Sequence, residues 1–236
     1  GIDDDIWNPD IDHHLPFHYS PDRIEGKLEN KQFLLRNTGL PFSEHRPLIG
    51  IISRLVVQKG FDLVADAIHD LMMMDAQWAV LGSGEIRFEN LFSSIAHTLP
   101  HKVWTYIGFN NELAHLIEAG ADMFLMPSRY EPCGLNQMYS LRYGTIPIVR
   151  KTGGLADTVQ DWHEFEAQGL DIGNGFSFDD ATGHALSTSV RQALEVFKRK
   201  PLWRKIQMNG MTRDFSWKAS AKKYVALYEK AIARKP

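Results

Sequence analysis

The sequence contains a single cysteine, Cys133, among 236 residues. One cysteine cannot form an internal disulfide or a thiolate cage for a metal, and nothing in its use indicates an oxidising compartment. Long apolar runs are also missing: Arg54 interrupts the longest one, LIGIISRLVV, well short of the roughly 18 residues that a membrane span needs. Neither sign of charge is in large excess, because the chain has 26 Lys and Arg residues and 29 Asp and Glu residues, for a net charge of −3. This balance argues against sequence-independent binding of nucleic acid, which requires a surplus of cations.

The remaining composition is that of a globular protein. Hydrophobic residues make up 44% of the chain and charged residues 23%, so we expect a sizeable core. A chain of this length forms one large domain or two small ones. It opens with GIDDDIWNP, without an initiator Met or a signal-like apolar stretch, and we expect it to begin inside a longer protein.

The chain divides at about residue 48. Residues 1–47 are rich in Asp, His, Pro and Asn and are predicted to be a polar lead-in outside the core, with one amphipathic helix over 22–38. Residues 48–236 alternate short apolar runs with stretches of helical period, which predicts an α/β fold, a doubly wound parallel sheet in one domain. Strands are expected at 48–53, 78–81, 103–107, 123–126, 146–149 and 175–178. Helices are expected at 61–73, 86–99, 111–119, 135–143 and 155–162, followed by additional C-terminal helices at 182–198, 201–209 and 217–233.

The first motif with chemical potential is SRLVVQKGF. Arg54 lies where the first core strand ends, and Lys59 lies beside Gly60 where a helix begins. Both cations can therefore face the crevice above the sheet and neutralise a diphosphate without a metal. The alternative is that Arg54 forms a salt bridge at the strand end and Lys59 is a solvated residue at the helix start.

Another glycine turn, LGSGE, follows the second core strand. Gly82 and Gly84 allow a ligand to approach the backbone and offer amides to an anion. The motif is a poor dinucleotide fingerprint, because its third glycine is replaced by Arg87.

The segment PSRYEPCGLNQMYSLRYG carries most of the predicted chemistry. Glu131 and Cys133 lie in a loop after the fourth strand, and the amides of Gly134, Leu135 and Asn136 open the next helix. A carboxylate beside free amides suits a sugar and its phosphate, bound side by side. The alternatives are a helix-terminal charge for Glu131 and a small buried filler for the cysteine. Nothing nearby in the sequence activates that cysteine as a nucleophile.

The last motif, KTGGLADTV, is again a strand, a pair of glycines and a helix. Gly153 and Gly154 permit close backbone approach, and Thr152 supplies a hydroxyl for a phosphate or for a helix cap. A helix-start turn without any ligand explains the pattern nearly as well. No Asp-x-Asp follows an expected core strand, so we expect no magnesium site of that design and no other metal or cofactor.

Taken in order, GID…WNP, SRLVVQKGFDL, LGSGE, SRYEPCGLNQMYSLRYGTIPIVRKTGGLADTV and FSWKASAKKY resemble the carboxyl-terminal half of bacterial glycogen synthases and plant starch synthases. The resemblance implies one Rossmann-like half of the two-domain GT-B arrangement. It also implies metal-free transfer of glucose from ADP-glucose to the non-reducing 4-OH of an α-1,4-glucan, with retention. The family's amino-terminal domain is absent from this chain. Such an enzyme is expected in the cytoplasm of a bacterium, or in a plastid if the source is a plant.

Carried over by position, the resemblance assigns Arg54 and Lys59 to the diphosphate and Glu131 to the glucose hydroxyls. The backbone of Cys133–Leu135 would lie along the sugar and phosphate. Phe109 stands where relatives place an aromatic residue, often Tyr, against the adenine.

Two further positions depart from patterns in the family or its broader relatives. Asn136 replaces the commoner Thr of the family, and Tyr139 stands where broader relatives carry a second Glu for the ribose.

Two rival functions stay open beside this one. A non-catalytic nucleotide-binding module would bind ADP and ignore the glucose, whereas an NAD-dependent oxidoreductase would need the full glycine fingerprint that is absent here. A partner is also expected, because Trp217, Tyr224 and Tyr228 lie on one apolar helix face. With the family's first domain absent, we expect this face to be partly bare and to drive self-association.

Overall fold

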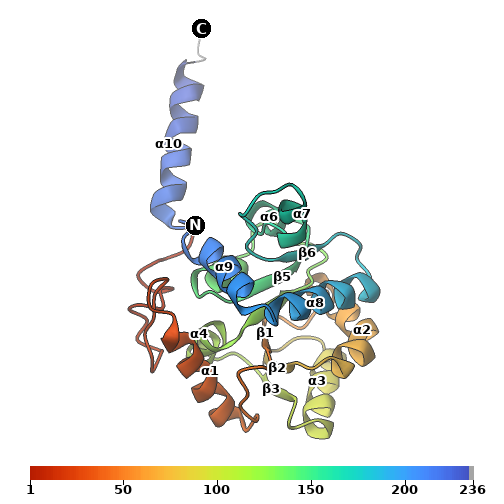
Figure 1. Ribbon diagram of the computed structural model, residues 1–236. Helices are drawn as coiled ribbons and strands as arrows, with labels where there is room; N and C mark the ends of the chain where they lie inside the picture. Colours follow the sequence, from red (N-terminus) through yellow and green to blue (C-terminus); the bar gives the residue numbers. More distant parts are fainter. Residues whose placement is uncertain (234–236) are drawn as a thin grey trace.

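The computed structural model describes residues 1–233, and it is built around a six-stranded, fully parallel sheet with the order β3-β2-β1-β4-β5-β6 (Figure 1). The strands are β1 (Leu48–Ile52), β2 (Gln77–Gly82), β3 (Val103–Ile107), β4 (Met123–Met126), β5 (Ile146–Arg150) and β6 (Phe176–Phe178). The helices are α1 (Glu25–Thr38), the 3-10 turn η1 (Val57–Lys59), α2 (Phe61–Met73), α3 (Ile86–Thr98), α4 (Asn111–Gly120), α5 (Asn136–Arg142), α6 (Gly153–Thr158), α7 (Trp162–Ala167), α8 (Gly183–Phe197), α9 (Lys200–Met211) and α10 (Trp217–Ala233). The predicted α/β class, doubly wound sheet and C-terminal helices are confirmed.

Helices cover both faces of the sheet because the central strands are apolar on both sides. Along β1, Ile49 and Ile51 join a cluster with α2, α3, α8 and α9, whereas Leu48 joins a second cluster with α1 and α4. Alternate residues of a strand point to opposite faces, so each apolar strand supplies both layers. Burial of apolar surface stabilises a fold by roughly 25 cal/mol for each Å² removed from water. The two apolar layers are therefore the main source of the stability of this fold.

The strand order reverses between β1 and β4. Neighbours on one side of β1 are β2 and β3, and neighbours on the other side are β4, β5 and β6. At such a switch point the connecting loops diverge and leave a crevice above the carboxyl ends of the strands. The fold therefore places the loops after β1 and β4 around one opening.

One predicted helix is wrong. The pattern predicted a single helix over 155–162, but the structure has α6, then a break at Val159 in extended conformation, then α7. Asp161 causes the second start, because its side chain accepts a hydrogen bond from the Glu164 amide at 3.0 Å. An N-cap of this kind begins a new helix even within an apparently continuous pattern.

The expectation that residues 1–47 lie outside the core is also wrong. Leu34, Leu35 and Leu40 are buried in the cluster that α1 forms with α4. The segment looked polar because α1 contains lysines, yet these lysines are buried with hydrogen-bond partners. Lys27 Nζ donates to Ala119 O at 3.0 Å, and Lys31 Nζ donates to Asp122 Oδ2 at 2.7 Å. Buried polar groups that are fully hydrogen-bonded let a polar-looking helix pack into a core.

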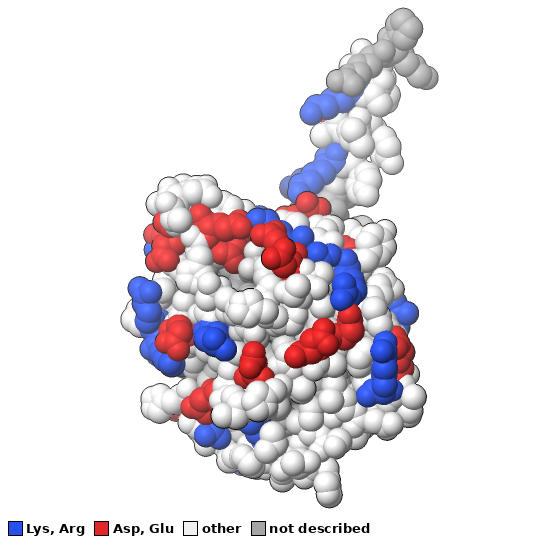
Figure 2. Space-filling model, turned by 90° about the vertical axis from the view of Figure 1, so that its right-hand side faces the viewer, with Lys and Arg blue, Asp and Glu red and all other residues white. Residues whose placement is uncertain are grey.

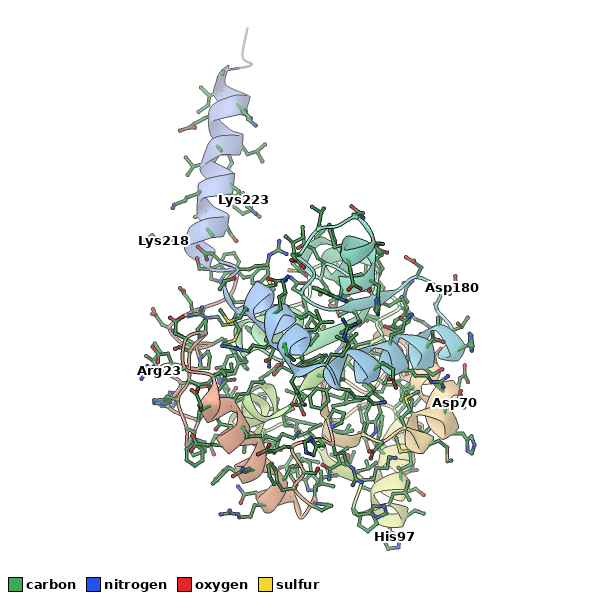
Figure 3. The ribbon with its side chains drawn as sticks, in the orientation of Figure 1. Arg23, Asp70, His97, Asp180, Lys218 and Lys223 are labelled. Carbon is green, nitrogen blue, oxygen red and sulfur yellow. The ribbon has the colours of Figure 1, made fainter. Side chains whose placement is uncertain are left out.

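Helix α10 extends away from the rest of the chain (Figure 1). Ile2 pairs with Ser216 just before this helix, so the first described residues and the base of α10 lie side by side. None of the residues of α10 is buried, and Figure 3 shows Lys218 and Lys223 along its length, beyond the sheet and its covering helices. In the described part of the chain, no helix combines the length and apolar character needed to cross a membrane.

Candidate active site

A cavity of about 250 Å³ opens at the carboxyl ends of β1 and β4, at the switch point of the sheet. The loops after these two strands and the start of α5 form its walls. Six of the residues predicted from the sequence line it together: Arg54, Lys59, Glu131, Gly134, Leu135 and Asn136. The cavity also contains Ile52, Ser53, Phe61, Leu125, Met126, Pro127 and Ser128.

Lys59 and Glu131 form an ion pair in this cavity. Lys59 Nζ lies 2.5 Å from Glu131 Oε2, and the side chains are 20% and 9% exposed. Their contact depends on Gly60, which has φ +78° and packs so closely that a Cβ atom there would lie 1.9 Å from the carbonyl oxygen of Pro127. The glycine thus brings the η1 turn against the loop that carries Glu131.

Arg54 contributes a second cation to the cavity wall. Its side chain makes no ion pair or hydrogen bond with any described residue. A free guanidinium offers a planar set of donors for a pair of anionic oxygens. The cavity therefore combines one unpaired cation with one cation that is neutralised by its own carboxylate.

Backbone amides complete the anion-binding groups. The amides of Gly134 and Leu135 donate no hydrogen bond within the described chain, and Gly134 has φ +69°, where glycine is favoured. Asn136 has a structural role, because its Nδ2 donates to the last carbonyl of β1, Ile52 O, at 2.8 Å. This bond fixes the start of α5 to the strand that leads to Arg54.

The glycines after β5 support the loop and do not line the cavity. Gly154 N donates to Glu131 O at 3.1 Å. A Cβ at Gly153 would lie 2.1 Å from Glu131 O, and one at Gly154 would lie 2.0 Å from Cys133 O. Thr152 is the N-cap residue of α6; its backbone is extended, and its side chain makes no capping hydrogen bond. Packing accounts for this pair of glycines, which fix the backbone position of Glu131.

The other predicted ligand-binding residues also lie outside the cavity. A Cβ at Gly82 would lie 1.9 Å from Ser53 O, and one at Gly84 would lie 2.4 Å from Leu55 O, so close packing of the β1 and β2 loops requires both glycines. Phe109 follows the edge strand β3 and is 85% exposed, and Cys133 is exposed. Their roles toward a nucleotide remain predictions.

Tyr139 has a packing partner that the sequence did not reveal. Its ring stacks on Trp7, with centroids 3.8 Å apart and planes 10° apart, and Trp7 stacks in turn on His115 with the same geometry. This aromatic stack links the first residues of the chain to α4 and α5. It gives a structural reason for an aromatic residue at position 139.

Two residues that hold the loop after β4 were not predicted from the sequence. Ser128 is buried, and its Oγ donates to Glu131 Oε2 at 3.1 Å. Arg150, at the end of β5, donates from Nε to the Ser128 carbonyl at 2.9 Å. Next to them, Arg129 forms an ion pair with Asp62 at 2.6 Å. Burial alone would raise the pKa of Asp62, but the hydrogen bond and the charge of Arg129 outweigh burial, so the pKa of Asp62 is lowered. The only signals in the sequence were a serine two residues after β4 and an arginine at the end of the neighbouring strand β5.

One cluster of metal-ligating type lies elsewhere. Asp12, His13 and His14 each place a ligand atom within 4.8 Å of the others. The Asp12 carboxylate is already hydrogen-bonded, however, to His115 Nδ1 at 2.7 Å and to Tyr143 Oη at 2.6 Å. Both bonds go to Oδ2 and tie the first residues of the chain to α4 and to Tyr143. The absence of a metal from the chemistry of this chain stays a prediction.

The face of the molecule shown in Figure 2 carries charges of both signs. Figure 2 shows Lys and Arg interspersed with Asp and Glu on one face of the molecule, with lysines continuing along α10. A surface of this kind gives little long-range steering.

Doubly wound sheets with fixed cations and free amides at the switch point form a class that binds phosphorylated ligands. This chain belongs to the family described as glycosyl transferases group 1, whose family model matches residues 37–204.

Bacterial glycogen synthases are among the curated relatives that match this chain. The chain is 50% identical over 228 residues to the glycogen synthase of Anaeromyxobacter dehalogenans (strain 2CP-C), covering 97% of this chain and 47% of that protein. It is 47% identical over 233 residues to glycogen synthase 1 of Methylococcus capsulatus, covering 99% of this chain and 47% of that protein. The chain therefore spans about half the length of the curated relatives it matches.

Solved structures agree with this result. The catalytic domain of starch synthase IV from Arabidopsis thaliana, bound to ADP and acarbose, matches with a TM-score of 0.90 and 37% identity over 99% of this chain and 48% of that chain. Sucrose-phosphate synthase from Thermosynechococcus elongatus shares the fold, with a TM-score of 0.62, 21% identity and coverage of 86% and 49%. The predicted resemblance to glycogen and starch synthases, and the assignment to one Rossmann-like half of a GT-B glycosyltransferase, are confirmed.

Proposed function

We propose that this chain binds ADP-glucose, and that the complete protein transfers the glucose to the non-reducing 4-OH of an α-1,4-glucan with retention. The observation that carries the proposal is the convergence of Arg54, Lys59, Glu131 and the free amides of Gly134 and Leu135 on one cavity. The starch synthase structure that resembles this chain was solved with ADP and acarbose bound.

The proposed chemistry follows from charge. Departure of ADP builds negative charge on the distal phosphate, and fixed cations and amides directed at that phosphate stabilise the transition state more than the ground state. Arg54 and Lys59 supply the cations. Glu131 is assigned to glucose hydroxyls, because its carboxylate accepts hydrogen bonds within the same cavity. Loss of one fixed donor at such a site typically lowers the rate by roughly 100-fold to 1,000-fold.

The ion pair adds a step to donor binding. Lys59 is neutralised by Glu131 before a donor arrives, so the diphosphate competes with this carboxylate for the ammonium. When the ammonium turns to the phosphate, the negative charge of the carboxylate is no longer neutralised, and a sugar hydroxyl can donate to its free oxygen more strongly. The pair therefore couples diphosphate binding to sugar binding.

Calorimetry with ADP, ADP-glucose, UDP-glucose and NAD tests the proposal directly. We expect ADP-glucose to bind more tightly than ADP, and both to bind in the presence of EDTA. Equal affinity for ADP and ADP-glucose would favour the non-catalytic nucleotide-binding module. Selective binding of NAD would favour the oxidoreductase, although the turn with Gly82 and Gly84 is explained by packing.

We further propose that these 236 residues alone do not elongate a glucan. Acceptor alignment and exclusion of water need a wall opposite the cavity, and the chain spans about half the length of its relatives. Measurable transfer of labelled glucose from ADP-glucose to maltooligosaccharides by this chain would contradict the proposal.

A further inference from the structure

The carboxylate of Glu131 is held asymmetrically. Both hydrogen bonds that it receives go to the same oxygen, Oε2: one from Lys59 Nζ at 2.5 Å and one from Ser128 Oγ at 3.1 Å. The other oxygen, Oε1, accepts none from the described residues. A carboxylate held by one oxygen presents the second in a fixed direction.

Only one of the two bonds to Oε2 is available throughout donor binding under the proposed function. Lys59 must turn toward the diphosphate to neutralise it, and that movement removes the stronger of the two contacts. Ser128 carries no charge that the diphosphate would attract. Its side chain stays in place because the residue is 2% exposed and its backbone carbonyl accepts a hydrogen bond from Arg150 Nε at 2.9 Å.

The backbone of Glu131 is fixed by a separate contact. Gly154 N donates to Glu131 O at 3.1 Å, and the glycine pair packs directly against the loop. The backbone support therefore does not depend on Ser128, and the serine hydroxyl acts on the side chain alone. A change at Ser128 can alter the direction of the carboxylate while the loop stays in place.

We infer that Ser128 is a positioning residue, which holds Glu131 by Oε2 so that the carboxylate stays directed at the glucose when Lys59 turns to the diphosphate. The inference rests on the proposed function, because it assigns Ser128 a role in recognising the glucosyl group of ADP-glucose. Hydrogen bonds to a charged group are stronger than neutral ones. The serine hydroxyl thus contributes to binding of the glucosyl group and contributes little to binding of the nucleotide.

The test measures affinity for ADP and for ADP-glucose by calorimetry in the wild-type chain and in Ser128→Ala. We expect the preference for ADP-glucose over ADP to fall by at least about tenfold, which is the lower end for loss of a hydrogen bond to a charged group. The affinity for ADP alone stays within about twofold, since the cations and amides that hold ADP are intact.

Two further variants separate positioning from general damage. Ser128→Thr keeps the hydroxyl and is expected to keep the preference, and Ser128→Cys, with similar volume and a weaker donor, replaces the alanine variant if the latter does not fold. Ser187→Ala is the matched control: Ser187 is also 2% exposed, and its hydroxyl bonds to a backbone carbonyl, His184 O, at 3.1 Å in α8, outside the cavity.

The outcomes are distinct. An unchanged preference in Ser128→Ala, or an equal loss of ADP and ADP-glucose affinity, overturns the positioning role while the proposed function stands. A wild-type chain that shows no preference for ADP-glucose overturns the proposed function and this inference with it.

Discussion

Replacing Lys59 by Met and Glu131 by Gln, separately and together, measures the interaction on which the cavity is built. Lys59→Met leaves a nearly buried carboxylate with Ser128 as its remaining partner, because the Glu131 side chain is 9% exposed. Glu131→Gln leaves an ammonium that is 20% exposed and can reach water. We therefore expect the lysine variant to lose more stability than the glutamate variant.

The separation of the Lys59 and Glu131 charges determines the strength of their interaction. Unit charges 2.5 Å apart attract by about 7 kcal/mol at an effective dielectric constant of about 20. Desolvation of both groups and ordering of the lysine side chain offset most of this, so we expect a net coupling of about 2 kcal/mol. Lys59→Met should cost about 2 to 3 kcal/mol, Glu131→Gln about 1 kcal/mol, and the double variant little more than the single glutamate change.

Urea denaturation of the four proteins at neutral pH provides the free energies of unfolding, and calorimetry with ADP provides a second readout. Glu131→Gln should bind ADP more tightly than wild type, because it frees Lys59 from its competing carboxylate. Additive destabilisation in the double variant, or weaker ADP binding by Glu131→Gln, would refute the competition described above.

Three other properties can be predicted from the same structure. Gly154→Ala places a Cβ 2.0 Å from Cys133 O, so we expect a loss of more than about 2 kcal/mol in urea denaturation together with weaker ADP-glucose binding; a stable variant with normal affinity would show that the loop adapts. Burial raises the pKa of Glu118 from 4.5 to about 8, so the folded state binds the extra proton and the stability this provides should be lost as pH rises from about 4.5 to about 8; Glu118→Gln should flatten this slope in thermal melts, and an unchanged slope would place its origin elsewhere. Trp217 and Tyr224 are 61% and 56% exposed on α10, so sedimentation velocity should show concentration-dependent association that Tyr224→Lys reduces, and a monomer at all concentrations would contradict this.

The part of the fold that depends on local pattern could be predicted from the sequence. Apolar runs such as Leu48–Ile52 are bounded by turns and buried on both faces, and each was recognised as a strand. The break between α6 and α7 depends on a single side-chain cap by Asp161, which periodicity does not report. The burial of α1 was missed because Lys27 gains its partners only from distant residues, Ala119 and Thr145.

In the candidate site, too, the residues placed by local pattern could be predicted and those that depend on three-dimensional contacts could not. Arg54, Lys59 and Glu131 were identified because each lies just beyond a strand or at a helix start, and parallel strands end at the same edge of the sheet. The glycine motifs were correctly located, but the structure gives them a packing role, since Gly82 and Gly154 contact backbone carbonyls too closely for any side chain. Ser128 was missed because its importance depends on which oxygen of Glu131 it contacts, and no sequence spacing encodes that geometry.

A crystal structure of this chain with ADP-glucose, grown without divalent cations, would place the donor relative to the cavity. We expect the diphosphate to lie between Arg54, Lys59 and the amides of Gly134 and Leu135, with Lys59 turned from Glu131 to the phosphate and glucose against Oε1 of that carboxylate. A nucleotide bound at another edge of the sheet, or a Lys59–Glu131 pair still intact beside the bound diphosphate, would contradict the proposed site.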